Sequence, residues 1–220
     1  MITTSSTKRL FFFALLLLMY TSGISHNLNP KHKNINNSSI PNTIIEESCL
    51  ADIIINEVDA DTAGTDILEF VELYDGGVGN SALDGMVLVF YNGSDNASYA
   101  AYDLDGQTTN GEGYFVIGNA AVTNVSIVIP SNGLQNGTDA VALYTGNDTD
   151  FPNDTPVTII NLLDAMVYDT NDSDNPDLLV LLNAGQAQIN EDGAGDKDVH
   201  SSQRIPNGAG GASAGQIYRG

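Results

Sequence analysis

From Ala51 onward, short apolar runs alternate with clusters of Gly, Asn and Asp such as DGGVGN, YNGSDN and SNGLQNG. Runs of β-branched and aromatic residues separated by turn residues are typical of strands. We predict strands at 52–58, 67–74, 85–91, 98–104, 113–118, 125–129, 139–145, 157–160, 162–168 and 199–205. This spacing indicates an all-β sandwich or barrel, and about 150 residues are enough to enclose a single core.

One stretch interrupts the strand pattern. In SDNPDLLVLLN, Asp174 or Asn175 precedes Pro176, and an apolar run follows. An Asx cap with proline at the first helical position predicts a short helix at 176–183, and a strand is the alternative. Residues 209–220 are rich in Gly and Ala and are expected to form a flexible tail.

The first 25 residues have the pattern of a secretory signal peptide. Lys8 and Arg9 precede the apolar run LFFFALLLLMY and the small residues of TSGIS, which predicts cleavage after Ser25. A signal anchor is the alternative, although a membrane span needs about 20 apolar residues. We expect a secreted, extracellular or periplasmic protein without membrane attachment in its mature form. Residues 26–47 are rich in Asn and Ser and predict a disordered linker before a domain at 48–208.

The charge of the chain restricts its partners. Without the signal peptide, five basic residues stand against 28 acidic ones, a net charge of −23, and residues 51–196 contain neither Lys nor Arg. Because nucleic-acid binding depends on basic patches, direct binding of nucleic acid is not expected. Divalent cations and basic partners suit this charge, and solubility alone would also explain it.

The residues that usually carry catalysis are sparse. His200 is the one histidine of the predicted domain, and neighbouring Ser201 or Ser202 would not complete a catalytic arrangement, since adjacent strand residues point to opposite faces. Cys49 is the single cysteine, so it is either a free thiol or part of an intermolecular bridge. We therefore predict no catalytic residues and no resident cofactor.

Two oxygen-rich clusters are candidates for calcium. DADTAG contributes Asp59 and Asp61, and DTNDSDNPD contributes Asp169, Asp172 and Asp174. Neither fits an EF-hand loop, so a calcium site here would use loop carboxylates in another arrangement. The alternative is a set of Asx turns, in which these side chains cap their own backbone.

Several Asn-X-Ser/Thr sequons would carry glycans if the chain passes through a eukaryotic secretory pathway. Those of the predicted domain are Asn92, Asn96, Asn124, Asn136, Asn147, Asn153 and Asn171, and Asn36 and Asn37 lie in the linker.

Segments along most of the predicted domain resemble the lamin tail domain family, in its secreted, non-lamin branch. They are INEVDAD (55–61), EFVELYD (69–75), LDGMVLVFYNG (83–93), GYFVIGN (113–119), GTDAVALYTG (137–146), LLDAMVYDT (162–170) and SSQRIPNG (201–208). The resemblance implies an immunoglobulin-like β-sandwich that acts as an interaction or adhesion module. The chain departs from lamins at Met86, where they carry Trp, and it has no coiled-coil rod.

Carboxylates inside predicted strands need an explanation. Alternation in EFVELY places Glu72 between Phe70 and Tyr74, on a face that we expect to be packed. Arg204 lies in another strand-like run, and both residues fall in segments that match the family. We predict a Glu72–Arg204 ion pair, with Glu57 and Glu69 facing solvent.

The sequence thus predicts a secreted binding or adhesion module of the lamin tail type, whose partner is an extracellular protein or a glycan. One alternative is an accessory domain or fragment of an exported nuclease- or phosphatase-type hydrolase. Another is a calcium-dependent adhesin.

Overall fold

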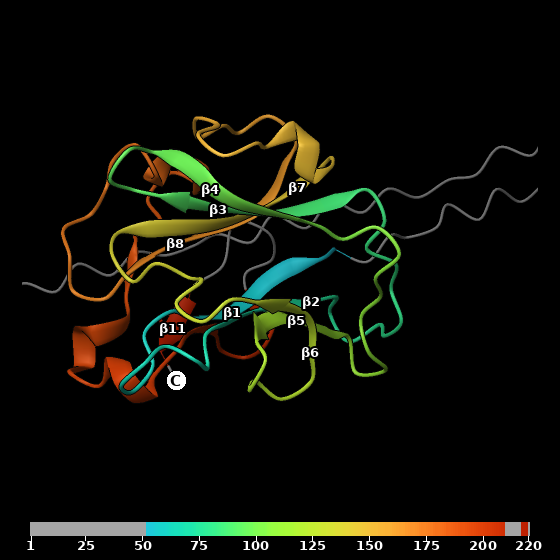
Figure 1. Ribbon diagram of the computed structural model, residues 1–220, viewed down its shortest axis with the longest axis horizontal. Coiled ribbons are helices and arrows are strands. Elements are labelled where there is room, and N and C mark those ends of the chain that lie inside the picture. Colours follow the sequence, from blue (N-terminus) through green and yellow to red (C-terminus); the bar gives the residue numbers. More distant parts are fainter. Residues whose placement is uncertain (1–51, 210–216, 220) are drawn as a thin grey trace, which may run out of the picture. The chain divides into compact units, whose positions relative to one another are not determined.

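The computed structural model describes residues 52–209 and 217–219, which form two β-sheets (Figure 1). The first sheet has the strand order β11-β10-β1-β2-β5-β6, and the second has the order β4-β3-β7-β8-β9. The strands of the first sheet are β1 (Ile54–Asp59), β2 (Phe70–Tyr74), β5 (Tyr114–Asn119), β6 (Val125–Ile129), β10 (Ser202–Arg204) and β11 (Ile217–Arg219). Those of the second are β3 (Met86–Asn92), β4 (Ala97–Asp103), β7 (Asp139–Thr145), β8 (Leu162–Asp169) and β9 (Ile189–Asn190).

Most neighbouring strands pair antiparallel. The exceptions are β5 with β6 in the first sheet and β8 with β9 in the second, which are parallel. The β1–β2 ladder shifts register between Ile55 and Glu57, so β1 carries a bulge at Asn56. The protein is therefore an all-β sandwich of two mixed sheets, as the strand pattern predicts.

The main core lies between the two sheets. It follows from alternation: every second residue of β2, β3 and β7 is apolar and faces the other sheet. Val71, Leu73, Leu88, Phe90 and Leu143 are all completely buried there.

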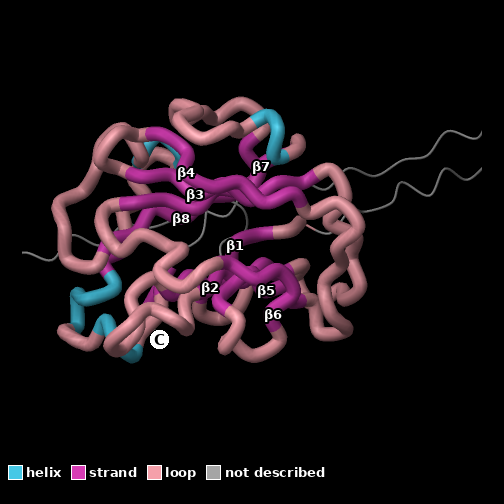
Figure 2. Tube along the Cα trace, viewed as in Figure 1, coloured by secondary structure: helices cyan, strands magenta, loops and turns pink. Residues whose placement is uncertain are grey.

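A second apolar layer covers the far face of the second sheet. Val87, Val89 and Tyr91 of β3 point away from the main core and pack against Phe151 and Leu178. These covering residues come from the connections after β7 and β8, which include the 3₁₀ turns η1 (Asp148–Asp150) and η2 (Leu179–Leu181). Figure 2 shows the two layers of strands and the loops that connect them.

Three elements differ from the sequence-based expectation. Residues 157–160 do not form a strand, although Val157 donates a backbone hydrogen bond to Asn96. The predicted helix at 176–183 is reduced to η2, because Leu178 and Leu181 turn inward onto the sheet and Leu182 is already extended. Residues 217–219, expected in a flexible tail, pair with β10 as β11.

Short elements between β8 and β10 were also missed. These are β9 and the 3₁₀ turns η3 (Glu191–Ala194) and η4 (Lys197–Val199). A two-residue strand has no sequence periodicity of its own, since it forms only by pairing with a neighbour.

Several predictions fall outside the described residues. They are the signal peptide at 1–25, the linker at 26–47 with its two sequons, and Cys49. Within the described ranges, no helix has the length and apolar character that a bilayer span requires.

Candidate functional site

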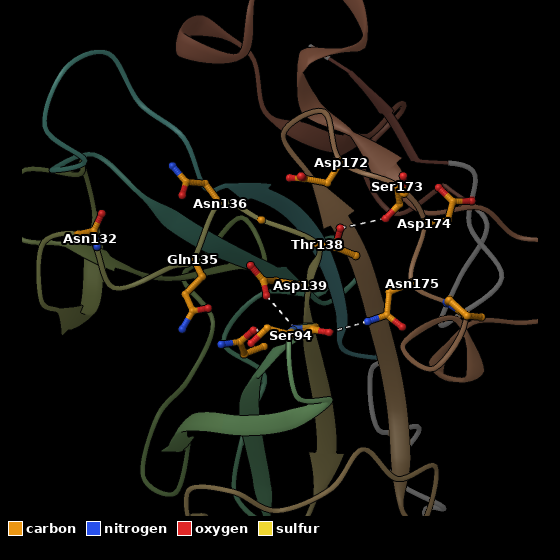
Figure 3. Close-up of a pocket in the computed structure, with 14 residues that line it drawn as sticks. Ser94, Asn132, Gln135, Asn136, Thr138, Asp139, Asp172, Ser173, Asp174 and Asn175 are labelled. Atoms are coloured by element: carbon orange, nitrogen blue, oxygen red, sulfur yellow. Dashed lines mark hydrogen bonds between the residues drawn. The ribbon is translucent and has the colours of Figure 1, made fainter.

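A polar cleft of about 670 Å³ lies where three connecting segments meet at one end of the second sheet (Figure 3). The segments are residues 92–94 at the end of β3, 132–139 leading into β7, and 172–176 after β8. Neutral amide and hydroxyl side chains provide most of the lining. The lining residues are Asn92, Gly93, Ser94, Asn132, Gln135, Asn136, Gly137, Thr138, Asp139, Asp172, Ser173, Asp174, Asn175 and Pro176.

Asp139, the first residue of β7, is the buried charge of the cleft and is only 2% exposed. Its Oδ1 accepts a hydrogen bond from the backbone N–H of Gly93 at 2.9 Å. Its Oδ2 is buried and has no hydrogen-bond partner among the described residues. A buried carboxylate oxygen without a donor is costly, so this atom is suited to accept a hydrogen bond from a ligand.

The protonation of Asp139 reflects this environment. Burial, above all, raises its pKa to about 6, the N–H groups of Gly93 and Gly137 oppose the rise, and the nearby charges of Asp172 and Asp95 add to it. At pH 7 the carboxylate is mostly ionised and can accept hydrogen bonds from a ligand.

Hydrogen bonds between the three segments fix the shape of the cleft. Asn175 donates through Nδ2 to the carbonyl of Gly93 and to Oδ1 of Asn96, both at 2.8 Å. Thr138 donates through Oγ1 to the carbonyl of Ser173 at 3.0 Å (Figure 3). These bonds join loops that are distant in sequence, so the cleft is largely preformed.

Glycine at position 93 is required by a close backbone approach. A Cβ atom there would lie 2.0 Å from the carbonyl oxygen of Thr138. Any other residue would push the 92–94 and 132–139 segments apart, and with them the two sides of the cleft.

The five predicted calcium ligands do not form one site. Asp172 and Asp174 line the cleft, whereas Asp169 accepts hydrogen bonds from the N–H groups of Asn171 and Asp172 and from Gln188 Nε2. Asp61 pairs with Lys197 at the end of β1. Among the described residues, no three His, Cys, Asp or Glu side chains are grouped so that they could share a metal ion. For Asp169, the Asx-turn alternative is the observed arrangement.

The predicted Glu72–Arg204 ion pair is wrong. Arg204 is 1% exposed and binds Asp164 of β8 through its Nη2, at 3.1 and 3.2 Å from the two carboxylate oxygens. Arg204 Nε also donates to the carbonyl of Ile55, and Asp164 Oδ2 accepts the Ile55 N–H, each at 2.8 Å. The ion pair thus joins the two sheets and satisfies the backbone groups that the β1 bulge displaces.

The two faces of β2 are reversed from the expectation. Val71 and Leu73 face the core, so Glu72 lies on the outer face with Phe70 and Tyr74. There Glu72 accepts a hydrogen bond from Asn56 Nδ2 at 2.8 Å.

Glu69, expected in solvent, is fully buried just before β2. Its Oε2 accepts hydrogen bonds from the N–H of Gly133 at 2.8 Å and from Asn119 Nδ2 at 3.2 Å. Burial raises its pKa, and these two groups oppose the rise. Neutral donors therefore replace the missing cation.

The sequons fall into two groups. Asn124, Asn147, Asn153 and Asn171 are exposed, whereas Asn92, Asn96 and Asn136 are half-buried. Asn92 and Asn136 line the cleft itself, so a glycan on either would occupy its mouth.

Sequence reasoning missed Asp139 and Asp164. Asp164 carried a usable signal, because alternation in LLDAMVYD places it on the same face as Met166 and Tyr168. Asp139 carried none, since the cleft depends on how three distant loops meet. Comparisons with family models, with curated proteins and with solved structures found no match.

Proposed function

We propose that this protein is a secreted binding module of the lamin tail type, without catalytic activity of its own, that binds glycans in the polar cleft around Asp139. The observation that carries the proposal is the buried Asp139 Oδ2, which accepts no well-formed hydrogen bond from the described residues, although the Gly137 N–H lies near the carboxylate, and which lies in a preformed cleft. A ligand hydroxyl would supply the missing hydrogen bond.

The composition of the lining favours a polyhydroxylated ligand. Eight lining side chains are neutral amides or hydroxyls and three are carboxylates, so the cleft offers both donors and acceptors in the pattern that sugar hydroxyls need. A cationic ligand could use the oxygen atoms of the lining but would leave its amide N–H donors without a partner. An anionic ligand is disfavoured, because residues 51–196 contain no Lys or Arg.

The fold supports the same type of function. Loops at the end of a rigid sandwich commonly carry binding residues, and the cleft lies at such a position. The segments that resemble the lamin tail family coincide with β1, β2, β3, β5, β7, β8 and β10.

The test is a glycan array followed by isothermal titration calorimetry, with the mature chain produced in a bacterium so that Asn92 and Asn136 stay unmodified. We expect a bound glycan whose affinity falls at least tenfold in Asp139→Asn, the loss of one charge-assisted hydrogen bond. Glu112→Gln, an exposed carboxylate outside the cleft, is the matched control and should bind normally. An array without binding, or equal affinity in both variants, would overturn the proposal.

A further inference from the structure

A second hollow, of about 410 Å³, lies on the outer face of the first sheet and shares no lining residue with the polar cleft. Five of its nine lining residues are apolar, including Phe70 of β2 and Val116 of β5. Its acidic lining residues are Glu57, Asp59 and Glu72, and none of the described residues that line it is basic. The hollow thus combines an aromatic ring with three carboxylates.

The strand register places these side chains next to one another. In the β1–β2 ladder, Glu57 lies opposite Glu72, and Asp59 lies opposite Phe70. The valine pair between them is buried in the core, so alternation turns all four neighbours toward the outer face. Side chains directly opposite each other have Cβ atoms about 4.5–5.5 Å apart, so the four form one continuous block.

The two glutamates of this block have only neutral partners. Like charges directly opposite each other on two strands repel. Glu57 accepts a hydrogen bond from Ser201 Oγ, and Glu72 accepts one from Asn56 Nδ2 at 2.8 Å. These donors solvate the carboxylates without neutralising them, and the ion pairs between described side chains join other carboxylates. A cation from outside would relieve the repulsion.

Asp59, predicted from the sequence as a calcium ligand, belongs to this hollow. Its Oδ1 is buried and accepts no hydrogen bond from the described residues. Burial, followed by the charges of neighbouring acids, Glu57 first, raises its pKa to about 7. No three acidic side chains of the described residues converge so that they could share a metal ion. A larger cation with several N–H donors does not need such convergence, because its donors are spread over its own width.

The strand beside Phe70 contributes no side chain to cover it. Gly118 lies opposite Phe70 in the β2–β5 ladder, and a Cβ atom there would lie 2.8 Å from Cβ of Phe70. Any other residue would displace Phe70. Residues 121–123 of the connection between β5 and β6 complete the lining. The half-buried ring is therefore available on the outer face.

We infer that this hollow binds an arginine side chain of a partner protein. The planar guanidinium group stacks on aromatic rings and donates N–H groups in a fork that fits carboxylates, whereas the ammonium of lysine is a compact point charge. Phe70 and the flanking carboxylates offer both kinds of contact. The net charge of −23 without the signal peptide would speed the encounter with a basic partner.

The experiment titrates the mature chain, produced in a bacterium, with a short amidated peptide that carries two arginines. Calorimetry and NMR of the backbone amides follow binding at pH 8 and physiological salt. Peptides of equal length with lysine or with neutral citrulline in place of arginine are the controls. We expect the arginine peptide to shift amide signals of β1, β2 and β5, to bind more tightly than the lysine peptide, and to lose binding when citrulline replaces arginine.

Two variants locate the site. Affinity for the arginine peptide should fall about tenfold in Glu72→Gln, the loss of one charge-assisted hydrogen bond. It should fall about threefold in Phe70→Leu, which removes the ring and keeps an apolar side chain. Asp154→Asn removes one charge from an exposed carboxylate outside both hollows and should bind normally. Thermal melts check that each variant is folded.

Equal affinity in all three variants would show attraction to the net charge alone and would overturn the inference. Equal binding of the lysine peptide would overturn the assignment to arginine. Binding that appears only after Lys31→Gln and Lys33→Gln would show that the chain's own basic residues fill the hollow. Self-association that Glu72→Gln abolishes would place a second copy of the chain there, and either result would overturn a separate partner. Glycan binding is tested with Asp139→Asn, so each proposal fails or stands by itself.

Discussion

The two sheets of the sandwich differ in how many of their faces are covered. In the second sheet, β3 and β7 are buried along almost their whole length, since one face packs on the main core and the other under the loops around η1 and η2. In the first sheet, β2 alternates between half-buried and buried residues, and β6 alternates between half-buried and exposed ones up to its buried last residue. The sequence shows part of this difference: MVLVFYN is apolar almost throughout, whereas FVELY and VSIVI carry a polar residue, Glu72 and Ser126, on the outer face.

The comparison explains where charge is tolerated. The outer face of the first sheet carries Glu57 and Glu72, and it folds without a cation because water and neutral side chains solvate it. In the second sheet, β8 has two buried acids: Asp169 accepts hydrogen bonds from neutral groups, whereas Asp164 receives Arg204 from the first sheet. Arg204 is thus used where solvent cannot reach, whereas Lys197 pairs with Asp61 at a half-exposed position.

The largest effect should come from breaking the ionic link between the sheets. Arg204→Met removes the guanidinium that neutralises the buried Asp164, and we expect a loss of about 3–5 kcal/mol in the free energy of unfolding. Urea denaturation measures it. Lys197→Met removes a half-exposed ion pair and should cost less than about 1 kcal/mol.

A double variant sharpens this test. Arg204→Met combined with Asp164→Leu should lose much less than the sum of the single losses, because no buried charge remains. Additive losses would mean that the two side chains do not depend on each other.

Substitutions on the covered outer face of the second sheet should reduce stability more than substitutions on the open outer face of the first sheet. Phe151 is 7% exposed and packs on Tyr144 with ring centroids 4.6 Å apart, so Phe151→Ala should cost about 3 kcal/mol. Val128 on β6 is 58% exposed, and Val128→Ala should change stability by less than about 0.5 kcal/mol. Similar losses in the two variants, measured by denaturation, would contradict the layered arrangement.

A smaller loss of stability is expected from a substitution in the connection between β2 of the first sheet and β3 of the second. Asp75, directly after β2, accepts hydrogen bonds from the N–H groups of Gly77, Val78 and Gly79 and from the hydroxyls of Ser81 and Thr109. Asp75→Asn replaces one of the two acceptor oxygens of this hydrogen-bond network by an amide NH₂ group. It should lower the free energy of unfolding by about 1–3 kcal/mol at pH 7.

The pH dependence gives Asp75 a separate signature. Burial raises its pKa, but the hydrogen bonds from Thr109, Ser81 and the two backbone groups outweigh burial, so the net pKa is lowered. A lowered folded pKa contributes stability above the unfolded value of about 3.9 and loses it as the pH falls. Asp75→Asn should therefore lose less stability between pH 5 and pH 2 than the unmodified chain, as followed by melting temperature.

The smallest effect is expected at Glu72. Its pKa is raised, first by burial, and a raised folded pKa lowers stability as the pH rises from the unfolded value of about 4.3 to the folded value, above which the cost is complete. Glu72→Gln should thus be neutral or stabilising by a few tenths of a kcal/mol at pH 7. A loss above about 1 kcal/mol in thermal melts would indicate an ionic partner after all.

The sequence predicts where the strands lie far better than which face of each strand is buried. Continuous apolar runs locate β3, β7 and β8 because burial on both faces leaves no polar position. In β2 the same reasoning failed, since the aromatic rings of Phe70 and Tyr74 suggested a packed face while smaller Val71 and Leu73 fill the core. Aromatic residues can remain half-buried on an outer face, as the stacked Tyr74 and Tyr114 show.

The candidate sites were harder to predict than the strands. Asp172 and Asp174 belong to a recognisable oxygen-rich run, so part of the cleft was visible in the sequence. Asp139 stands in ordinary surroundings, and its importance arises only from burial by distant segments. Pairing across 109 residues, as between Asp164 and Ile55, leaves no local pattern to detect.

Strand β6 has a consequence for the behaviour of the protein at high concentration. It is the last strand of the first sheet among the described strands, and its sequence VSIVI carries no charge or proline. Such an edge is a template for pairing with another chain and so for aggregation. Asn124 is exposed directly before it, and a glycan there would shield the edge, so unglycosylated material should aggregate more readily than glycosylated material.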